Sequence, residues 1–322
     1  MKKGAFLIYL LAISLTGFSQ NLSKYVKKNS ISPDTARKHF NIAVELKKQG
    51  KLKEAIQEYD QAITANPNLG EAYMNRGNIK SQLKDDNEAI KDYTIAEGIL
   101  KNDPEVYYNI GNAQKNLKQY NEAILDYDKA LLIKENADYY LSRGFAKKQL
   151  GKSEEAILDF SNAIKIKPDF ENAFFNRGNA KQGINDFKGA LEDYSKALSL
   201  NPKNSKAYTN RGNTKSKLED YTGAVEDYDM SIKIDPHNSA TYSNRGLAKG
   251  KLKDYDGAIK DYSTSLTINP TNGETYFSRA GAKINLKDVE GACSDLKKAA
   301  EMGYERAKNM YEKNCNEPIP LK

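Results

Sequence analysis

The sequence predicts an all-α protein in which short helix pairs stack in series to form a solenoid. Three observations support this fold class: a tripeptide recurs at a fixed distance, small and aromatic residues occupy fixed places between its copies, and the composition is too polar for one large core. The chain has 322 residues, 29% of them charged, no Trp and a mean hydropathy of −0.76. A solenoid tolerates such a composition because each repeat buries only the faces that it shares with its neighbours.

Residues 1–19 are expected to form a secretory signal peptide that is removed from the mature chain. Lys2 and its neighbour supply positive charge, residues 5–15 are mostly apolar, and small residues precede a cleavage site before Gln20. The apolar run is shorter than the ~20 residues that a spanning helix needs, so an uncleaved anchor is the less favoured alternative. We therefore expect an exported chain, periplasmic or secreted, that has no integral membrane span and begins with a polar linker over residues 20–35.

Eight copies of a repeat of 34 residues follow, over residues 36–303. The tripeptide Asn-Arg-Gly marks four of them, with its asparagine at Asn75, Asn176, Asn210 and Asn244. Gly111 and Gly144 stand at the glycine position of two more, and the spacing between these two glycines is 33 residues. A fixed period of this length is typical of stacked helical repeats. The repeats begin at Ala36, Gly70, Pro104, Ala137, Glu171, Ser205, Ser239 and Gly273.

Each repeat, numbered from position 1, predicts two amphipathic helices. Positions 4, 5 and 8 lie on one face of the first helix, and positions 20, 21, 24, 27 and 28 lie on one face of the second. Position 8 is Gly or Ala, position 20 is Ala in every repeat, position 27 is Ala or Ser, and positions 4 and 24 are nearly always aromatic. A polar turn near position 15 joins the helices, and Pro at position 32 of five repeats ends the second one.

The chain resembles the tetratricopeptide repeat family in five of these positions: 8, 20, 24, 27 and 32. The resemblance covers about residues 36–306, and it departs from the family at position 4, where Tyr or Phe replaces the usual Trp. It implies a right-handed superhelix whose first helices line a concave groove, and it implies other proteins or peptides as partners. Residues 304–315 are expected to form a capping helix, followed by a loose tail over residues 316–322.

Two cysteines lie near the C-terminal end. Cys293 falls in the second helix of repeat 8 and Cys315 at the end of the capping helix. An even number of cysteines in an exported chain favours a disulfide, so we expect these two to pair. The alternative is a buried, free Cys293, because position 21 is otherwise Ile, Val or Leu.

Position 7, which is usually apolar in the family, is Arg in six repeats, and position 23 is acidic in all eight. We infer a ladder of Arg–carboxylate pairs that is structural rather than ligand-binding. If the pairs formed within repeats, Glu58 and Asp126 would face Ile42 and Ile110 and would lack an arginine. If they formed between neighbouring repeats, fewer acidic residues would lack one, so pairing between neighbours is favoured. The predicted ladder comprises Arg76, Arg143, Arg177, Arg211, Arg245, Arg279, Asp126, Asp159, Asp193, Asp227 and Asp261.

Asparagine is frequent at positions 6 and 9 of the first helices, which the resemblance places in the groove. Asn side chains offer donors and acceptors to a peptide backbone, and apolar residues at position 5 would add side-chain pockets. The alternative is a ladder bonded to its own neighbours or to water. The family's clamp for a C-terminal carboxylate is not expected, because it needs Lys at position 5. The predicted peptide-binding residues are Asn75, Asn78, Asn109, Asn112, Asn176, Asn179, Asn210, Asn213, Asn244, Met74, Tyr108 and Phe175.

No pattern in the sequence predicts catalysis. The two histidines, His39 and His237, fall in different repeats, and no metal-ligand spacing or phosphate-binding loop occurs. The formal charge of +7 is spread along the chain, which argues against nucleic-acid binding. We therefore expect a protein-binding scaffold that is not an enzyme and uses no cofactor or metal. Alternatives are a structural component of an envelope assembly and a binder of glycans or cell-wall polymer.

Overall fold

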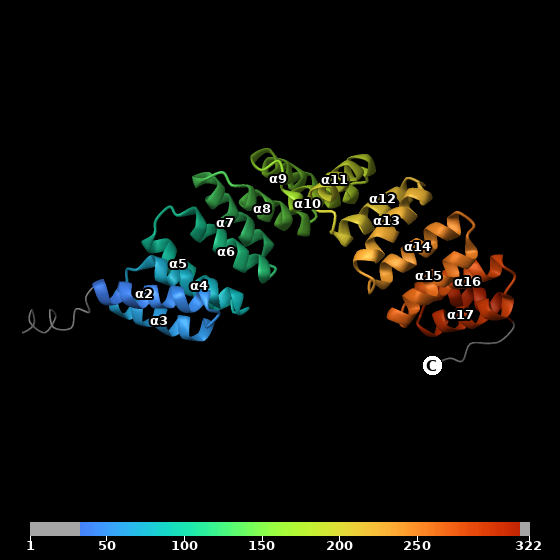
Figure 1. The fold of residues 1–322 in the computed structure, drawn as a ribbon, viewed down its shortest axis with the longest axis horizontal. Helices are drawn as coiled ribbons and strands as arrows, with labels where there is room; N and C mark the ends of the chain where they lie inside the picture. The colour runs from blue at the N-terminus through green and yellow to red at the C-terminus, as the bar shows by residue number, and fades with distance from the viewer. Residues whose placement is uncertain (1–32, 316–322) are drawn as a thin grey trace, which may run out of the picture. The chain divides into compact units, whose positions relative to one another are not determined.

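The computed structural model describes residues 33–315, and in this range the chain forms 17 α-helices and no strands (Figure 1). It confirms the predicted all-α helical-repeat fold. The predicted signal peptide, most of the linker and the tail lie outside the described residues. The chain divides into an N-terminal body that ends at Glu135 and a C-terminal body that begins at Asn136.

The N-terminal body contains repeats 1–3. The first helix begins at Pro33, so residues 33–35 belong to it and not to the linker, because proline suits the first turn of a helix. The helices are α2 (Pro33–Lys48), α3 (Leu52–Ala65), α4 (Gly70–Gln82), α5 (Asp86–Ile99), α6 (Pro104–Asn116) and α7 (Tyr120–Ile133). The second helices α3 and α5 each contact the first helix of their own repeat and that of the next, and α7 contacts α6.

The C-terminal body contains repeats 4–8 and a final helix. Consecutive helices contact one another throughout, and the first helices of successive repeats also touch. This stacking is the arrangement that the repeat period predicted. The helices are α8 (Ala137–Gln149), α9 (Ser153–Ile166), α10 (Glu171–Gly183), α11 (Phe187–Leu200), α12 (Ser205–Lys217), α13 (Tyr221–Ile234), α14 (Ser239–Lys251), α15 (Tyr255–Ile268), α16 (Gly273–Asn285), α17 (Val289–Glu301) and α18 (Glu305–Asn314).

The small residue at position 8 lets the aromatic ring at position 24 reach the first helix. A Cβ atom added to Gly77 would lie 2.7 Å from Cε1 of Tyr93, and one added to Gly212 would lie 2.7 Å from Cε1 of Tyr228. These rings are buried, as are the alanines at position 20. A larger residue at position 8 would therefore displace the ring and separate the two helices.

The turn between the helices of a repeat uses a left-handed residue at position 15, followed at position 16 by a capping residue in several repeats. Gly50 has φ of 76°, whereas Lys253 adopts φ of 66° despite its side chain. Asp254 then accepts a hydrogen bond from the backbone N–H of Gly257 at 3.0 Å, which caps the second helix. Local chemistry therefore sets both helix ends.

The helix α18 closes the last repeat. Its Ala307 and Tyr311 are buried against repeat 8. Cys293 and Cys315 form a disulfide with their Cα atoms 5.8 Å apart, which ties the end of α18 to α17. A cross-link of this kind stabilises chiefly by restricting the unfolded chain.

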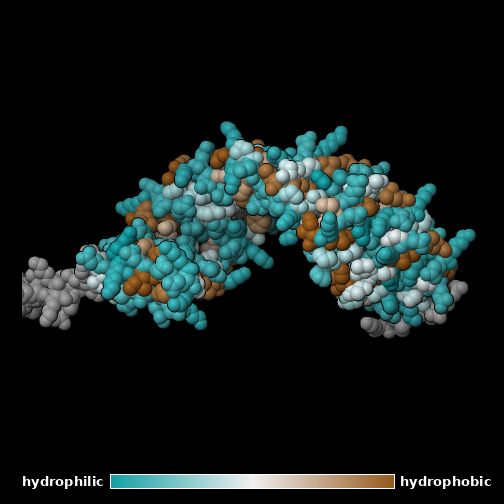
Figure 2. Space-filling view, in the orientation of Figure 1, coloured by the Kyte–Doolittle hydropathy of each residue, from teal (hydrophilic) through white to brown (hydrophobic). Residues whose placement is uncertain are grey.

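The surface of each body is mostly hydrophilic on the face that Figure 2 shows, with small, separate hydrophobic patches. Within residues 33–315, none of the helices combines the length and the apolar character that crossing a membrane requires.

Candidate functional site

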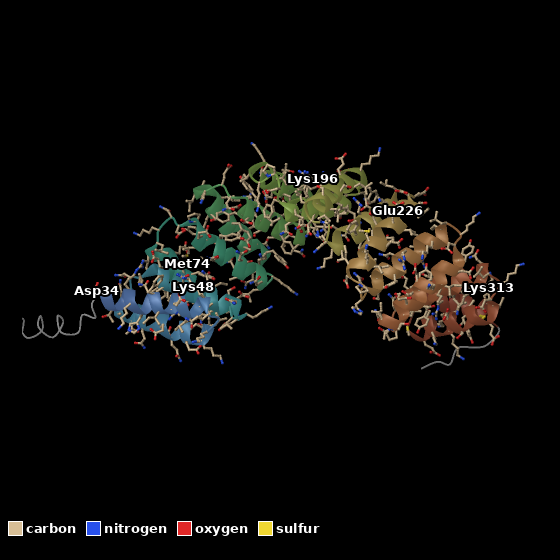
Figure 3. All side chains as sticks on the ribbon, viewed as in Figure 1. Asp34, Lys48, Met74, Lys196, Glu226 and Lys313 are labelled. Atoms are coloured by element: carbon tan, nitrogen blue, oxygen red, sulfur yellow. A yellow bond between two sulfur atoms is a disulfide. The ribbon has the colours of Figure 1, made fainter. Side chains whose placement is uncertain are left out.

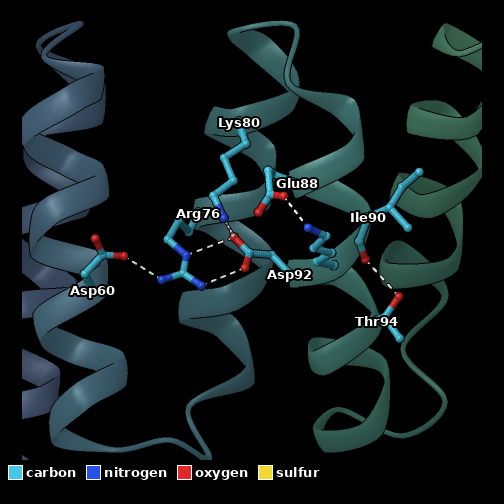
Figure 4. Close-up of polar contacts among 8 residues, drawn as sticks. Asp60, Arg76, Lys80, Glu88, Ile90, Asp92 and Thr94 are labelled. Atoms are coloured by element: carbon cyan, nitrogen blue, oxygen red, sulfur yellow. Dashed lines mark hydrogen bonds and ion pairs between the residues drawn. The ribbon is translucent and has the colours of Figure 1, made fainter.

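A buried ion cluster, which we call the clamp, joins the two helices of a repeat. In repeat 2, Arg76 donates two hydrogen bonds to the carboxylate of Asp92, from Nε at 2.9 Å and from Nη2 at 2.6 Å (Figure 4). Lys80 Nζ lies 2.8 Å from the same carboxylate, whose side chain is 3% exposed. Two cations therefore compensate a carboxylate that would be costly to bury alone.

The clamp recurs in every repeat of the C-terminal body. Each arginine also lies over the aromatic ring at position 4, with its Cζ atom 5.4–5.6 Å from the ring centre. The hydrogen bonds to Asp227 and its negative charge raise the pKa of Arg211, so this arginine keeps its charge at any physiological pH. The clamps are Arg143–Asp159–Lys147, Arg177–Asp193–Lys181, Arg211–Asp227–Lys215, Arg245–Asp261–Lys249 and Arg279–Asp295–Lys283.

This pairing corrects the expectation that position 7 binds the acidic residue at position 23 of a neighbouring repeat. The arginine binds position 23 of its own repeat, because packing of position 8 on position 24 sets position 7 beside position 23. The Nη1 group of the arginine donates a hydrogen bond to the side chain at position 25 of the preceding repeat. The acceptors there are Asp60, Ser161, Ser195, Asp229 and Ser263.

Repeats 1 and 3 have no clamp, and their acidic residues lie beside other side chains of their own repeat. Glu58 lies 2.6 Å from Nδ1 of His39. Asp126 lies 2.7 Å from Nζ of Lys129 on its own helix. The lysine at position 11 was not among the residues predicted for the ladder. Its signal was available, because Lys occurs at position 11 in the same six repeats that have Arg at position 7.

The asparagine at position 9 accepts a hydrogen bond from the tyrosine at position 24. Tyr228 donates to Oδ1 of Asn213 at 2.8 Å, and Tyr194 shares its one hydroxyl hydrogen between Oδ1 of Asn179 and Oε1 of Gln182, each at 2.8 Å. Burial raises the pKa of Tyr228 to about 12, so its hydroxyl remains a donor at neutral pH. In the N-terminal body, Tyr93 and Tyr127 bond Asn78 and Asn112 in the same way, at 2.8 Å and 2.9 Å.

Position 6 of the following repeat extends this network in repeats 5–7. Asn210 Nδ2 donates to Oδ1 of Asn179 at 2.7 Å, and Asn244 Nδ2 donates to Oδ1 of Asn213 at 2.9 Å. The ladder is thus bonded to its own neighbours here, which is the alternative that the sequence left open. Both acceptor sites of Asn179 and Asn213 are occupied, whereas their Nδ2 groups have no partner within residues 33–315.

The remaining predicted asparagines take other positions. Asn75 and Asn176 donate to carbonyl oxygens of their own helices, those of Glu71 at 3.0 Å and Asn172 at 2.8 Å. Asn109 is half-buried, and its side chain forms no hydrogen bond with the described part of the chain. The amide groups that accept from both a tyrosine and the asparagine of the next repeat therefore lie in repeats 5 and 6 of the C-terminal body.

The predicted apolar residues at position 5 are half-buried beside this network. Phe175 lies with its ring centre 6.1 Å from that of Tyr194, and Tyr108 lies 5.9 Å from Tyr127. Met74 holds the equivalent place on α4 and is labelled in Figure 3. Each presents part of its surface to solvent, and Met74 packs against the buried cluster that contains Tyr93.

Position 12 adds a lysine to the same face of the first helices in repeats 1, 3 and 4. Lys115 Nζ donates to Oδ1 of Asn112 at 2.9 Å, and burial lowers the pKa of this lysine. Burial also lowers the pKa of Lys148 on α8, which has no ion-pair partner among the residues described. In the described range, no group of three or more His, Cys, Asp or Glu side chains is arranged to hold a metal.

Models of known families match most of the repeats. The model described as tetratricopeptide repeat matches residues 104–136, 171–204, 205–238 and 239–272, and the one described as TPR repeat matches residues 43–84 and 146–183. No curated protein matches the sequence.

Solved structures share the fold at low sequence identity. A tetratricopeptide repeat protein from Parabacteroides merdae ATCC 43184 is 21% identical, with a TM-score of 0.56 over 77% of this chain and 99% of that one. YrrB, described as a TPR protein with an unusual peptide-binding site, is 24% identical, with a TM-score of 0.50 over 57% of this chain and 95% of that one. The Cut9–Hcn1 hetero-tetramer of APC/C is 13% identical, with a TM-score of 0.57 over 82% of this chain and 52% of that one.

Proposed function

The chain belongs to the tetratricopeptide repeat family, and from this premise we propose that it is a non-enzymatic scaffold that binds an extended peptide along the first helices of its C-terminal body. Repeats of this family form protein–protein interaction scaffolds. The finer proposal concerns where the partner binds and which groups hold it.

The orientation of two amide groups carries the proposal. Asn179 and Asn213 each use Oδ1 for two internal hydrogen bonds, so the N–H groups of Nδ2 are the part of the amide that remains for a ligand. Their orientation is held from beneath by buried tyrosines. A fixed row of donors suits the carbonyl oxygens of a peptide backbone, because such donors lose little freedom on binding.

The spacing of the repeats matches an extended chain. Packed helices lie roughly 8–10 Å apart, and an extended peptide advances about 3.3 Å per residue. One amide group per repeat would therefore meet a carbonyl at about every third residue of the peptide. Side chains between these carbonyls would contact position 5, where Phe175 is half-buried. The fold similarity to YrrB, whose description includes a peptide-binding site, is consistent with this proposal.

Export remains part of the proposal, since residues 1–19 lie outside the described range. The basic start, apolar run and small residues before Gln20 support cleavage there. Amino-terminal sequencing of the chain recovered from the producing cell's envelope or medium would be expected to begin at Gln20. Recovery of the uncleaved chain with the cytoplasmic fraction would contradict export.

The proposed site is tested by changing donors without changing the fold. Asp at positions 179 and 213 keeps the acceptor oxygens for the tyrosines but removes the Nδ2 donors. Neutral 12-residue peptides selected from a display library on the chain from Gln20 would be titrated by fluorescence anisotropy. We expect the Asn179→Asp/Asn213→Asp variant to bind about tenfold more weakly, as loss of two hydrogen bonds predicts.

A matched control adds the same charge elsewhere. Asn162 on α9 and Asn309 on α18 are exposed, so Asn162→Asp/Asn309→Asp should leave the affinity unchanged. Circular dichroism would check that all three proteins are folded. Equal affinity of both double variants would remove these asparagines from the site and direct attention to the second helices.

A further inference from the structure

The first helices of repeats 5–7 are rich in positive charge. In α10, α12 and α14, Glu171 is the only acidic side chain, and it accepts a hydrogen bond from Asn204 at 2.6 Å. Beyond the clamp residues, these helices carry Lys206, Lys217 and Lys251. Each clamp adds to the excess, because it sets two cations against one buried carboxylate.

The second helices of the same body carry exposed acidic residues. Glu226 on α13 is exposed and is labelled, together with Lys196 on α11, in Figure 3. Asp229 on the same helix is exposed and receives Arg245 from the next repeat. The first helices α10, α12 and α14 thus carry a net positive charge, whereas lysines on the second helices are balanced by acidic side chains, so a negatively charged partner would be attracted to the first-helix face.

One stripe of α12 brings the unpaired cations and the amide donors together. Positions 2, 6, 9 and 13 follow a spacing of four, three and four residues, which places them on one side of a helix. On α12 these are Lys206, Asn210, Asn213 and Lys217. Both lysines are exposed, and neither has an ion-pair partner in the part of the chain that the structure describes. The stripe carries two free ammonium groups and the N–H groups of Asn213, and it includes no acidic side chain.

The next first helix continues the stripe with an apolar residue. On α14 position 2 is Ala240, positions 6, 9 and 13 hold Asn244, Leu247 and Lys251, and Leu247 is 53% exposed. An exposed leucine between polar neighbours on a binding face needs an apolar partner to be removed from water. The stripes of α12 and α14 are joined by the hydrogen bond from Asn244 to Asn213 at 2.9 Å.

We infer that the partner segment bound on α12 and α14 contains both acidic and apolar side chains. This inference rests on the proposed function and specifies its peptide. Carboxylates of the segment would meet Lys206 and Lys217, an apolar side chain would cover Leu247, and the backbone would accept from Asn213. The stripe from position 2 to position 13 extends roughly 16 Å along α12, so a peptide that crosses the helix at Asn213 has one lysine of the stripe on each side of it. An anionic polysaccharide would form ion pairs with the lysines but would offer no apolar group to cover Leu247. A peptide with acidic and apolar side chains matches both features.

Three labelled probes would test the inference against the chain from Gln20. One is a 12-residue peptide of alternating Glu and Leu, the second has every Glu replaced by Gln, and the third is polygalacturonate. The variant Lys206→Gln/Lys217→Gln removes the free cations of the stripe. Its control, Lys188→Gln/Lys196→Gln on α11, removes two exposed lysines from a second helix. We expect the acidic peptide to bind about tenfold more weakly to the first variant and equally well to the control, with the difference reduced by added salt.

Each contrary result has a definite meaning. Equal losses in the two lysine variants, or equal affinity for the Glu and Gln peptides, would overturn the inference. The proposed function would still stand if Asn179→Asp/Asn213→Asp weakened binding of the Gln peptide. Binding of polygalacturonate through Lys206 and Lys217 without binding of the acidic peptide would replace the peptide by a polysaccharide. Failure of all peptides, including library-selected ones, to bind would overturn both proposals.

Discussion

Repeats 2 and 3 lie next to each other in the N-terminal body. Their two helices pack in the same way, but different charged residues surround the buried acid. In both, a glycine at position 8 meets a tyrosine at position 24, and a Cβ atom added to Gly77 or Gly111 would lie 2.7 Å from the ring. Both also bury an acidic residue at position 23, Asp92 or Asp126. The helix pairs therefore form in the same way whether or not the clamp is present.

The difference lies in what surrounds the buried carboxylate. Asp92 receives Arg76 and Lys80 from the facing helix. Repeat 3 has an isoleucine at position 7 and Gln114 at position 11, where Oε1 of Gln114 is buried without a hydrogen-bond partner among the described residues. Asp126 is held by Lys129, whose side chain is 51% exposed. The comparison teaches that the small and aromatic residues determine the helix pairing. The clamp determines how much stability is lost when the acidic residue is replaced.

The largest expected effect follows from removing the carboxylate of repeat 2. Asp92→Asn leaves Arg76 and Lys80 largely buried without their shared counter-charge, and we expect a loss of about 3 kcal/mol in the free energy of unfolding. Asp126→Asn should cost about 1 kcal/mol or less, because Lys129 can return to water. Urea unfolding followed by circular dichroism would measure both, and hydrogen exchange would locate the loss in repeats 1–3.

Arg76→Lys provides a control for this interpretation. It keeps the charge but loses the paired hydrogen bonds of the guanidinium, so its cost should lie between those of the two Asn substitutions. Equal destabilisation by Asp92→Asn and Asp126→Asn would mean that the facing cations contribute nothing beyond packing, and the contrast between the repeats would disappear.

The sequence was sufficient for the helix pairs and for the arginine and the acid of the clamp, but not for its lysine or for which residues pair. Position 8 with position 24, and the arginine with an acid, follow from residue type and period. The period does not determine whether the arginine binds a residue of its own repeat or of a neighbouring one, since both kinds of pairing recur every 34 residues. In the structure Arg177 uses both sides, with Nε and Nη2 on Asp193 and Nη1 on Ser161.

The sequence predicted which asparagines belong to the candidate site, but not which atom of each amide group faces a ligand. Asparagine at positions 6 and 9 indicated a polar face, but the choice between donor and acceptor depends on the hydroxyl of a tyrosine 15 residues away. Tyr194 and Asn210 both bond Oδ1 of Asn179, and this leaves Nδ2 exposed to a ligand. The orientation of this amide group cannot be predicted from a periodic pattern of side-chain types.

A second, smaller effect concerns the tyrosine beside the clamp at high pH. Burial, and then the charges of Asp86 and Asp92, raise the pKa of Tyr93 above the ordinary value of about 10. Its contribution to stability is complete below pH 10 and is lost as the pH rises toward the folded-state pKa, because the unfolded chain releases the proton first. The slope is about 1.4 kcal/mol for each pH unit above 10.

The variant Tyr93→Phe should therefore reverse its rank with pH. Near pH 8 it should be less stable than the parent by about 1 kcal/mol, since Asn78 loses its donor. Between pH 10 and 11 its stability should fall less steeply than that of the parent. Phenylalanine is expected to fit, because Phe160 occupies this position in repeat 4. Parallel urea midpoints at pH 8, 10 and 11 would measure both effects, and identical slopes would exclude Tyr93 as a source of alkaline instability.

The smallest effect comes from transferring the clamp to repeat 3. Ile110→Arg with Gln114→Lys gives Asp126 the two partners that Asp92 has and removes the unpaired Oε1 of Gln114. The new Nη1 would face position 25 of repeat 2, where Thr94 donates its hydroxyl hydrogen to the carbonyl of Ile90 at 2.8 Å and so keeps lone pairs to accept (Figure 4).

We expect a gain of about 1 kcal/mol for this double variant, because the satisfied carboxylate outweighs the loss of one buried apolar side chain. The same double substitution in an Asp126→Asn chain should destabilise, since two buried cations would then lack a counter-charge. Thermal unfolding of the two proteins beside their parents would measure the coupling. A gain in both backgrounds would show that the cations stabilise without the carboxylate, and the clamp would then be an effect of helix surface charge instead of a paired cluster.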